Sequence, residues 1–220
     1  MITQSIFLSI ISKNFIKGET LGQGKDGKVT QYKSIINGDE FALKEILICP
    51  EDEEMNQETI NELIQKYNKE NCELTLQPHP NIVRVLHFFL SDDKKTFLIF
   101  MEKLEKTLTK EIFERRANLN YLENLRKGEE NEEIKKEEQK HNTYYTFDQF
   151  KEIVESLINA FSYLQKLKIA HRDIKTDNLM FDRSGVLKIV DLGECSLESD
   201  NKHSYNISVQ GKLNIIKNTN

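Results

Sequence analysis

Hydrophobic and polar residues change their spacing several times along the chain. From Phe15 to about Ile48, short apolar runs alternate with glycines, which predicts strands joined by turns. From about Asp52 the spacing becomes helical, because apolar residues recur every three or four positions between Ile60 and Leu74. The first part of the chain therefore predicts a β-rich unit with one main helix.

The next part of the chain predicts two more strands and then a second long helix. Strands are expected at 82–89 and 97–101, after a Pro-His-Pro segment that should end the preceding helix. The second helix is expected to start after Thr146, which has the capping-box spacing with Gln149. Six apolar residues fall on one face of this helix: Phe147, Phe150, Val154, Leu157, Phe161 and Leu164.

Two segments depart from these patterns. Between Lys127 and Lys140, ten of fourteen residues are charged, six Glu and four Lys. We interpret residues 117–146 as a solvated, partly helical or disordered insert, with a regulatory or docking insert as the alternative. The N-terminal stretch MITQSIFLSIISKNF is apolar, but it is short and no basic residues precede it. We expect it to pack as a strand or helix at the edge of the domain and not to act as a targeting signal.

Composition excludes several classes of protein. The 220 residues are 38% hydrophobic and 30% charged, with a net charge of 31 − 36 = −5. This balance suits a folded domain, and without a basic block it gives no support to nucleic-acid binding. No apolar run is long enough to span a membrane. The three scattered cysteines lack a Cys-x-x-Cys spacing, so we expect reduced thiols and an intracellular, cytoplasmic protein.

A glycine-rich pattern, G-x-G-x-x-G-x-V, is present in Leu21-Gly22-Gln23-Gly24-Lys25-Asp26-Gly27-Lys28-Val29. In a hairpin, such glycines let backbone N–H groups approach phosphates without interference from Cβ atoms. On its own the pattern also fits an ordinary turn. A Rossmann dinucleotide site is disfavoured, because residues 30–36 predict a strand and not a helix.

Lys44 lies downstream of this pattern, in the strand-like segment Phe41-Ala42-Leu43-Lys44-Glu45-Ile46. A lysine in a strand usually faces solvent. The preceding glycine-rich turn makes a phosphate-binding ammonium group the alternative.

The most specific motif is His171-Arg172-Asp173-Ile174-Lys175-Thr176-Asp177-Asn178, which matches H-R-D-x-K-x-x-N in an expected loop. Asp191-Leu192-Gly193 stands eighteen residues beyond Asp173, directly after a strand expected at 187–190. With the glycine-rich pattern and Lys44 in the same order, the chain resembles the eukaryotic protein kinase family of the Ser/Thr type. The resemblance extends from about Phe15 to Gly211.

The resemblance implies an α+β, bilobal fold. Residues 1–103 would form a β-rich N-lobe with one main helix and the start of the hinge. Residues 104–220 would form a partial, incomplete helical C-lobe that carries the insert. The implied activity is transfer of the γ-phosphoryl group of Mg·ATP to Ser or Thr hydroxyls of protein substrates.

Roles for individual residues also follow from the resemblance. Asp173 would accept or orient the proton of the acceptor hydroxyl, and Lys175 would neutralise the transferring phosphoryl group. Lys44 would bind the α- and β-phosphates of ATP, and Asn178 and Asp191 would hold Mg²⁺. The other nucleotide-binding residues would come from the glycine loop, the following strands and the gatekeeper and hinge: Leu21, Gly22, Gly24, Gly27, Val29, Ala42, Met101, Glu102 and Leu104.

One implied residue has two candidates, the helix glutamate that pairs with Lys44. We favour Glu70, because Leu74 four residues later falls on the same helical face, where the family has an apolar residue. Glu73 is the alternative if the extra Pro78 shifts the register.

The chain departs from the family pattern in four places. Leu192 replaces the usual Phe, Thr176 replaces the common Pro, and Lys212 removes a hydroxyl expected to contact the catalytic residues. No proline follows Asp191, so an A-P-E motif is absent, and the chain ends before the family's large buried helix. We therefore expect the 147–164 helix and the catalytic loop to expose apolar surface. The alternative function is a truncated, catalytically impaired nucleotide-binding or interaction module.

Regulation is a last implication of the resemblance. Arg172 directly precedes Asp173, an arrangement that in the family reads a phosphorylated activation segment. An upstream kinase acting on residues 191–211 is thus a candidate partner, with Ser208 as the first choice of site.

Overall fold

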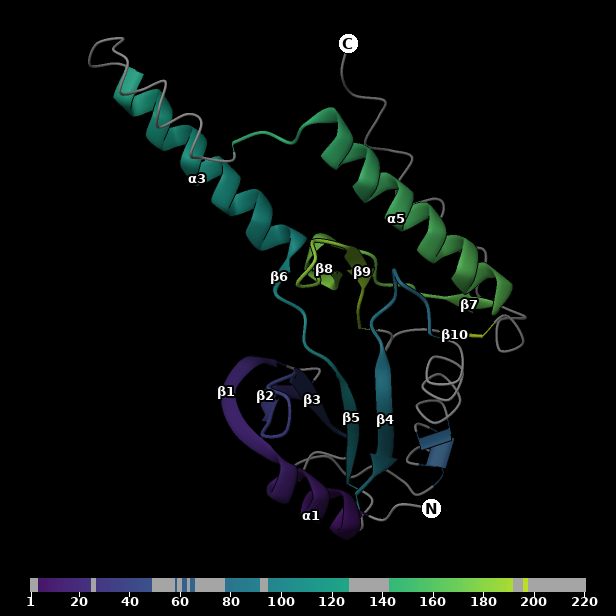
Figure 1. Ribbon diagram of the computed structural model, residues 1–220. Helices are drawn as coiled ribbons and strands as arrows, with labels where there is room; N and C mark the ends of the chain where they lie inside the picture. The colour runs from purple at the N-terminus through teal and green to yellow at the C-terminus, as the bar shows by residue number, and fades with distance from the viewer. Residues whose placement is uncertain are drawn as a thin grey trace.

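The molecule has a β-rich part built from the first half of the chain and a helical part built from the second half (Figure 1). This arrangement is taken from a computed structural model. The residues that it describes are 4–24, 27–48, 58, 61–62, 64–65, 78–91, 95–126, 143–191 and 196–197.

The β-rich part is a five-stranded antiparallel sheet with the order β1-β2-β3-β5-β4. β3 and β5 lie inside the sheet, and most of their apolar residues are buried, from Ala42, Leu43 and Ile46 of β3 to Phe97–Phe100 of β5. All five strands fall in segments where the spacing of apolar residues predicted them. Their bounds are β1 Phe15–Gly24, β2 Gly27–Ser34, β3 Glu40–Leu47, β4 Val85–Leu90 and β5 Thr96–Glu102.

Helix α1 (Gln4–Asn14) packs on one face of this sheet. Phe7 and Ile11, four residues apart on the helix, are buried against Leu43, Leu98 and Phe100. The ring of Phe7 also lies 5.7 Å from that of Phe100 in an edge-on arrangement. The expectation of an edge element packed on the domain is thus confirmed, and the element is a helix.

The predicted helix over 60–74 lies mostly outside the described residues. Asn61, Glu62, Ile64 and Gln65 are helical, and Ile64 packs against the core. Glu70 and Glu73 both lie outside the described residues, so the choice between them stays a prediction.

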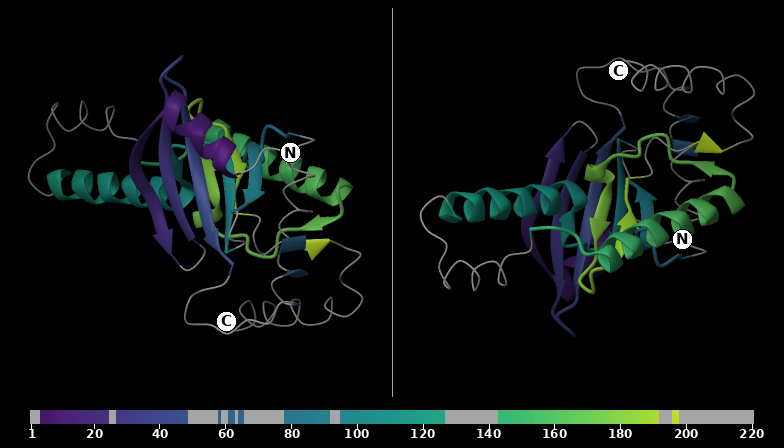
Figure 2. Two further views of the ribbon diagram at one scale, coloured as in Figure 1. Left: turned by 90° about the horizontal axis from the view of Figure 1, so that it is seen from below. Right: turned by 90° about the horizontal axis from the view of Figure 1, so that it is seen from above.

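Two long helices dominate the second part of the chain, α3 (Leu108–Arg126) and α5 (Phe147–Lys166). Both views of Figure 2 show α3 extending to one side of the sheet and α5 lying toward the other. The short elements are β6 Lys106–Thr107, β7 Ile169–Ala170, the 3₁₀ helix η1 Thr176–Asn178, β8 Leu179–Phe181, β9 Leu187–Ile189 and β10 Ser196–Leu197. No described helix is long and apolar enough to cross a membrane.

Helix α5 begins with the predicted capping box. The Thr146 hydroxyl accepts a hydrogen bond from Gln149 N at 3.2 Å, and the Gln149 side chain accepts one from Thr146 N at 3.1 Å. The two bonds satisfy backbone donors that the helix itself leaves unpaired.

The structure describes only the two ends of the predicted insert. Residues 117–126 continue α3, in keeping with a partly helical excursion, and residues 127–142 lie outside the described part of the chain. Arg115 Nη1 donates a hydrogen bond to the Tyr144 carbonyl oxygen at 2.7 Å, and its guanidinium lies 4.0 Å from the centre of the Tyr145 ring. The chain therefore returns to the base of α3 before α5 begins.

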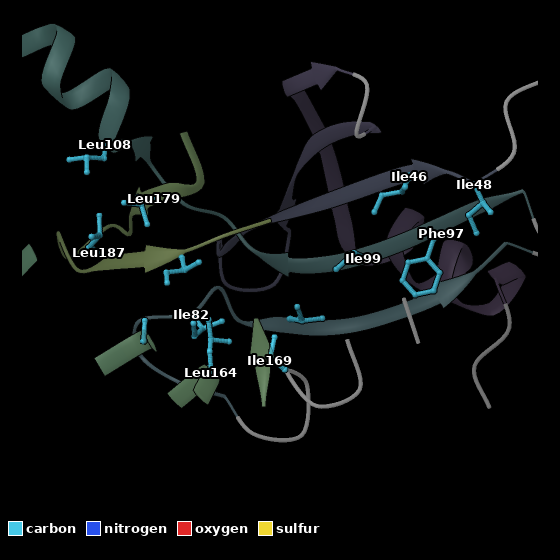
Figure 3. Close-up of a cluster of buried hydrophobic side chains, with 13 residues drawn as sticks. Ile46, Ile48, Ile82, Phe97, Ile99, Leu108, Leu164, Ile169, Leu179 and Leu187 are labelled. Atoms are coloured by element: carbon cyan, nitrogen blue, oxygen red, sulfur yellow. The ribbon is translucent and has the colours of Figure 1, made fainter. Parts of the chain in front are cut away.

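One hydrophobic core joins the sheet to the helical part (Figure 3). Ile46 and Phe97 from the sheet belong to the same buried cluster as Leu164 of α5 and Ile189 of β9. The predicted apolar face of α5 is covered only in part. Leu164 is buried, whereas Phe147 is 79% exposed, Phe150 57% and Phe161 40%, and Ile174 in the loop before η1 is 42% exposed. The expected exposure of apolar surface on this helix and loop is confirmed.

Candidate active site

A cavity of about 650 Å³ lies between the sheet, the segment after β5, and the β8–β9 region. Its size suits a ligand of nucleotide dimensions. The predicted site residues that line it are Leu21, Gly22, Val29, Ala42, Lys44, Met101, Glu102, Leu104, Asn178 and Asp191.

Of the predicted site residues that the structure describes, four are not among those lining the cavity. Gly24 and Gly27 form the tip of the β1–β2 hairpin, where they pair with each other. Asp173 and Lys175 lie in the neighbouring loop, which Asn178 connects to the cavity.

The glycines of the β1–β2 hairpin are required for two different reasons. Gly27 has φ +114°, and a Cβ there would collide with the Glu45 carbonyl oxygen of β3, so only glycine fits. A Cβ on Gly22 or Gly24 would meet no atom within 4 Å. These two glycines leave space open beside the cavity, which is what a phosphate-covering loop requires.

Lys44 and Asp191 meet at one end of the cavity. Lys44 Nζ, on β3, lies 2.6 Å from Asp191 Oδ1, which follows β9. The two side chains are 13% and 28% exposed, so the ion pair is partly shielded from water. Asp191 has φ +58°, a strained conformation for a residue other than glycine, and such strain is concentrated at functional sites.

The side chain of Asn178 holds together the loop that runs from His171 to Asn178. Its Nδ2 donates to the Asp173 carbonyl oxygen at 2.8 Å and to Asp173 Oδ2 at 2.9 Å. The backbone joins this loop to the strand region before Asp191, because Val190 N donates to the Asn178 carbonyl oxygen at 2.9 Å. His171 Nε2 lies 2.9 Å from the Val190 carbonyl oxygen and closes the same junction.

Asp173 and Lys175 form an ion pair at the edge of the site, with Nζ and Oδ2 2.7 Å apart. The hydrogen bond from Lys175 lowers the pKa of Asp173, and a bond from Asn178 acts in the same direction. The hydrogen bond to Asp173 in turn raises the pKa of Lys175. Asp173 is therefore an ionised hydrogen-bond acceptor, and Lys175 a cation, across the neutral pH range.

The end of β5 is anchored at the predicted residue Glu102 by Lys188 and Arg84, which sequence reasoning missed. The Glu102 carboxylate accepts hydrogen bonds from Lys188 Nζ, at 2.8 and 3.1 Å, and from Arg84 N at 2.7 Å. Lys188 is buried in β9 between two apolar residues. A lysine inside an otherwise apolar strand could have signalled such a partner, since buried lysines are almost always paired.

Asn178 and Asp191 are suited to Mg²⁺. The Asn178 nitrogen bonds to Asp173, which leaves its amide oxygen for a metal, and Asp191 Oδ2 is not taken by Lys44. Mg²⁺ prefers oxygen ligands and is usually bound by one or two protein groups together with substrate phosphates. The described residues include no group of three or more His, Cys, Asp or Glu side chains that could hold a metal ion.

Comparison with known proteins identifies the family. The protein kinase domain matches residues 15–212, and the chain belongs to this family. It is 26% identical over 182 residues to CBL-interacting serine/threonine-protein kinase 9 of Arabidopsis thaliana, covering 82% of this chain and 32% of that protein. It is 32% identical over 178 residues to mitogen-activated protein kinase kinase kinase 1a of Physcomitrium patens, covering 80% and 19%. The chain thus spans about a fifth to a third of the length of these relatives.

Proposed function

We propose that this chain acts as an ATP-dependent protein serine/threonine kinase. The observation that carries the proposal is the 2.6 Å ion pair between Lys44 and Asp191, two residues 147 positions apart in the sequence that meet at one cavity. Family membership supports the same reaction, as does the relative named as a serine/threonine-protein kinase.

Mg·ATP, when bound, would supply the transferable γ-phosphoryl group. Lys44 carries the positive charge suited to the α- and β-phosphates, and the open space beside Gly22 and Gly24 admits them to the hairpin. Asn178 and Asp191 would hold Mg²⁺ through their side-chain oxygens. Glu70 stays the proposed helix partner of Lys44.

Asp173 and Lys175 would act on the acceptor. The ionised Asp173 carboxylate can accept a hydrogen bond from a Ser or Thr hydroxyl and so hold its oxygen toward the phosphoryl group. Lys175, 2.7 Å from that carboxylate, places a positive charge where negative charge develops during transfer. We further propose protein hydroxyls as acceptors and an upstream kinase acting on residues 191–211.

The test compares phosphate transfer with nucleotide binding in the same purified protein. Asp173→Asn should lower transfer of labelled phosphate to a generic Ser/Thr substrate by about 10²- to 10⁴-fold, because an amide is a poor proton acceptor. Its thermal stabilisation by Mg·ATP should stay close to that of the wild type. Lys44→Met should lose both the stabilisation and the transfer.

A control variant and one contrary result complete the test. Glu155→Gln removes an exposed carboxylate on α5 and should leave both readouts unchanged. Equal labelling by wild type and Asp173→Asn would show that another kinase produced the signal, and the catalytic assignment would fail.

A nucleotide-binding or interaction module is the second candidate, favoured by the exposed apolar face of α5. Folded wild type that is stabilised by Mg·ATP but yields no labelled product would select this function.

A further inference from the structure

An ion pair between Glu40 and Lys103 continues the ladder between β3 and β5 beyond its last backbone pair. Phe41 and Glu102 form that last pair, so Glu40 and Lys103 are the next residues along the two paired segments. Lys103 Nζ lies 3.1 Å from Glu40 Oε2, and the two side chains are 14% and 33% exposed. At this step side chains, in place of backbone bonds, attach the segment after β5 to the sheet.

Glu40 is itself fixed from the neighbouring strand. Gln31 Nε2, on β2, donates to Glu40 Oε1 at 2.7 Å, while Oε2 is left for Lys103. The hydrogen bond from Lys103 lowers the pKa of Glu40, and the positive charges of Lys33 and Arg183 act in the same direction. Glu40 therefore presents a fixed, ionised carboxylate to the hinge.

The position of Lys103 gives this ion pair a consequence for the cavity. Glu102, Lys103 and Leu104 all line the cavity, and the Leu104 side chain is buried. Beyond Leu104, the chain is next held where Glu105 N donates to the Phe181 carbonyl oxygen at 2.9 Å. Between Glu102 and Glu105, the Lys103 side chain is thus a link to the sheet, and its Nζ also lies 3.6 Å from Glu105 Oε2.

We propose that Glu40 is a positioning residue for nucleotide binding, which acts through Lys103 to hold the backbone at Leu104 against the adenine side of the cavity. The inference rests on the proposed nucleotide-binding function. It adds a residue outside the cavity lining, whose carboxylate controls how well the hinge backbone is preorganised for the base.

The test measures the Kd of two probes, Mg·ATP and adenosine, by calorimetry. Glu40→Gln and Lys103→Gln should each raise both Kd values by about two- to fivefold, the range for an ion pair that is only partly shielded from water. Adding Glu40→Gln to Lys103→Gln should raise neither Kd value further, because Lys103→Gln has already removed the ion pair. At about 1 M salt the difference between wild type and Glu40→Gln should shrink, because screening weakens the pair.

Two controls separate positioning from general damage. Glu114→Gln breaks a Lys–Glu pair of similar length, 3.0 Å to Lys106, whose two residues do not line the cavity, and it should leave both Kd values unchanged. Lys44→Met should weaken Mg·ATP but not adenosine, since adenosine has no phosphates to contact Lys44.

Each outcome bears on a different statement. If wild type binds neither probe, the proposed nucleotide site fails. If wild type binds but Glu40→Gln binds equally well, or if Glu40→Gln weakens binding as much beside Lys103→Gln as it does alone, Glu40 has no positioning role and only this inference is overturned.

Discussion

The apolar side chains on the sheet face that α1 covers are buried, whereas half of those on the apolar face of α5 are exposed. On the sheet, α1 covers the aromatic cluster, and its Phe7 and Ile11 are almost fully buried. On α5, Ala160 and Leu164 are buried in the core, whereas Phe147 and Phe150 are exposed. The β-rich part therefore covers its own apolar surface with a helix of the same chain. Half of the apolar face of α5 has no cover among the described residues.

This difference predicts which region stabilises the fold and which region favours association with other molecules. Burial of aromatic side chains supplies much of the free energy of folding, so the α1–sheet contact should dominate the stability of the β-rich part. Exposed apolar side chains contribute little to that free energy and favour association.

The largest effect on stability is expected for Phe7→Ala. Phe7 contacts the rings of His87, Phe89 and Phe100, with centroids 4.5–5.7 Å apart, so its loss leaves a cavity between α1 and the sheet. The free energy of unfolding should fall by about 3–5 kcal/mol in urea denaturation. Ile10→Ala, on the exposed side of the same helix, should change it by no more than about 0.5 kcal/mol. Equal losses for both variants would show that α1 does not stabilise the sheet by burial.

The sequence was most informative where a residue's role depends on its neighbours along the chain. Strand alternation and the Thr146–Gln149 capping box are local signals, and both are found in the structure. The helix over 117–126 was less visible, because this part of α3 is polar on most sides around the buried Leu122, so its apolar period is weak.

Contacts between distant segments could be predicted only through the family resemblance or not at all. The resemblance assigned Lys44 and Asp191 to one nucleotide site, but the ion pair that joins them connects β3 to the end of β9. The ion pair of Glu40 with Lys103 could not be predicted from the sequence. Charged residues do not contribute to the apolar periodicity, and whether these two meet depends on the register of β3 against β5.

A smaller effect is expected at the junction of the two regions, where His79 stacks on Tyr163 of α5 with ring centroids 4.6 Å apart. Burial lowers the pKa of His79, and the charges of Lys166 and Lys188 act in the same direction. His79 Nδ1 also accepts a hydrogen bond from Asn81 N at 3.1 Å, which requires that nitrogen to be unprotonated.

The sign of the pH dependence follows from that lowered pKa. The unfolded chain binds a proton at His79 more readily than the folded chain. The contribution of neutral His79 to the free energy of unfolding is therefore complete above about pH 6.5, and it is lost as the pH falls toward the pKa of His79 in the folded state. His79→Asn keeps an acceptor but cannot titrate in this range. Between about pH 7.5 and 5.5, urea midpoints of the wild type should fall more than those of His79→Asn. Parallel decreases in both proteins would assign the pH dependence to other groups.

The smallest effect on stability is expected for Phe150→Ser on the uncovered face of α5. Its side chain is already 57% exposed, so the change should alter the free energy of unfolding by no more than about 0.5 kcal/mol. The same change should reduce self-association in sedimentation velocity, because it removes apolar surface from water-exposed α5. Leu164→Ser, on the buried side of the same helix, is the matched control. It should destabilise the protein strongly, because it places an unpaired hydroxyl and a cavity in the core. A large loss of stability in Phe150→Ser would mean that Phe150 is covered in solution, and the contrast between α5 and the α1-covered sheet would disappear.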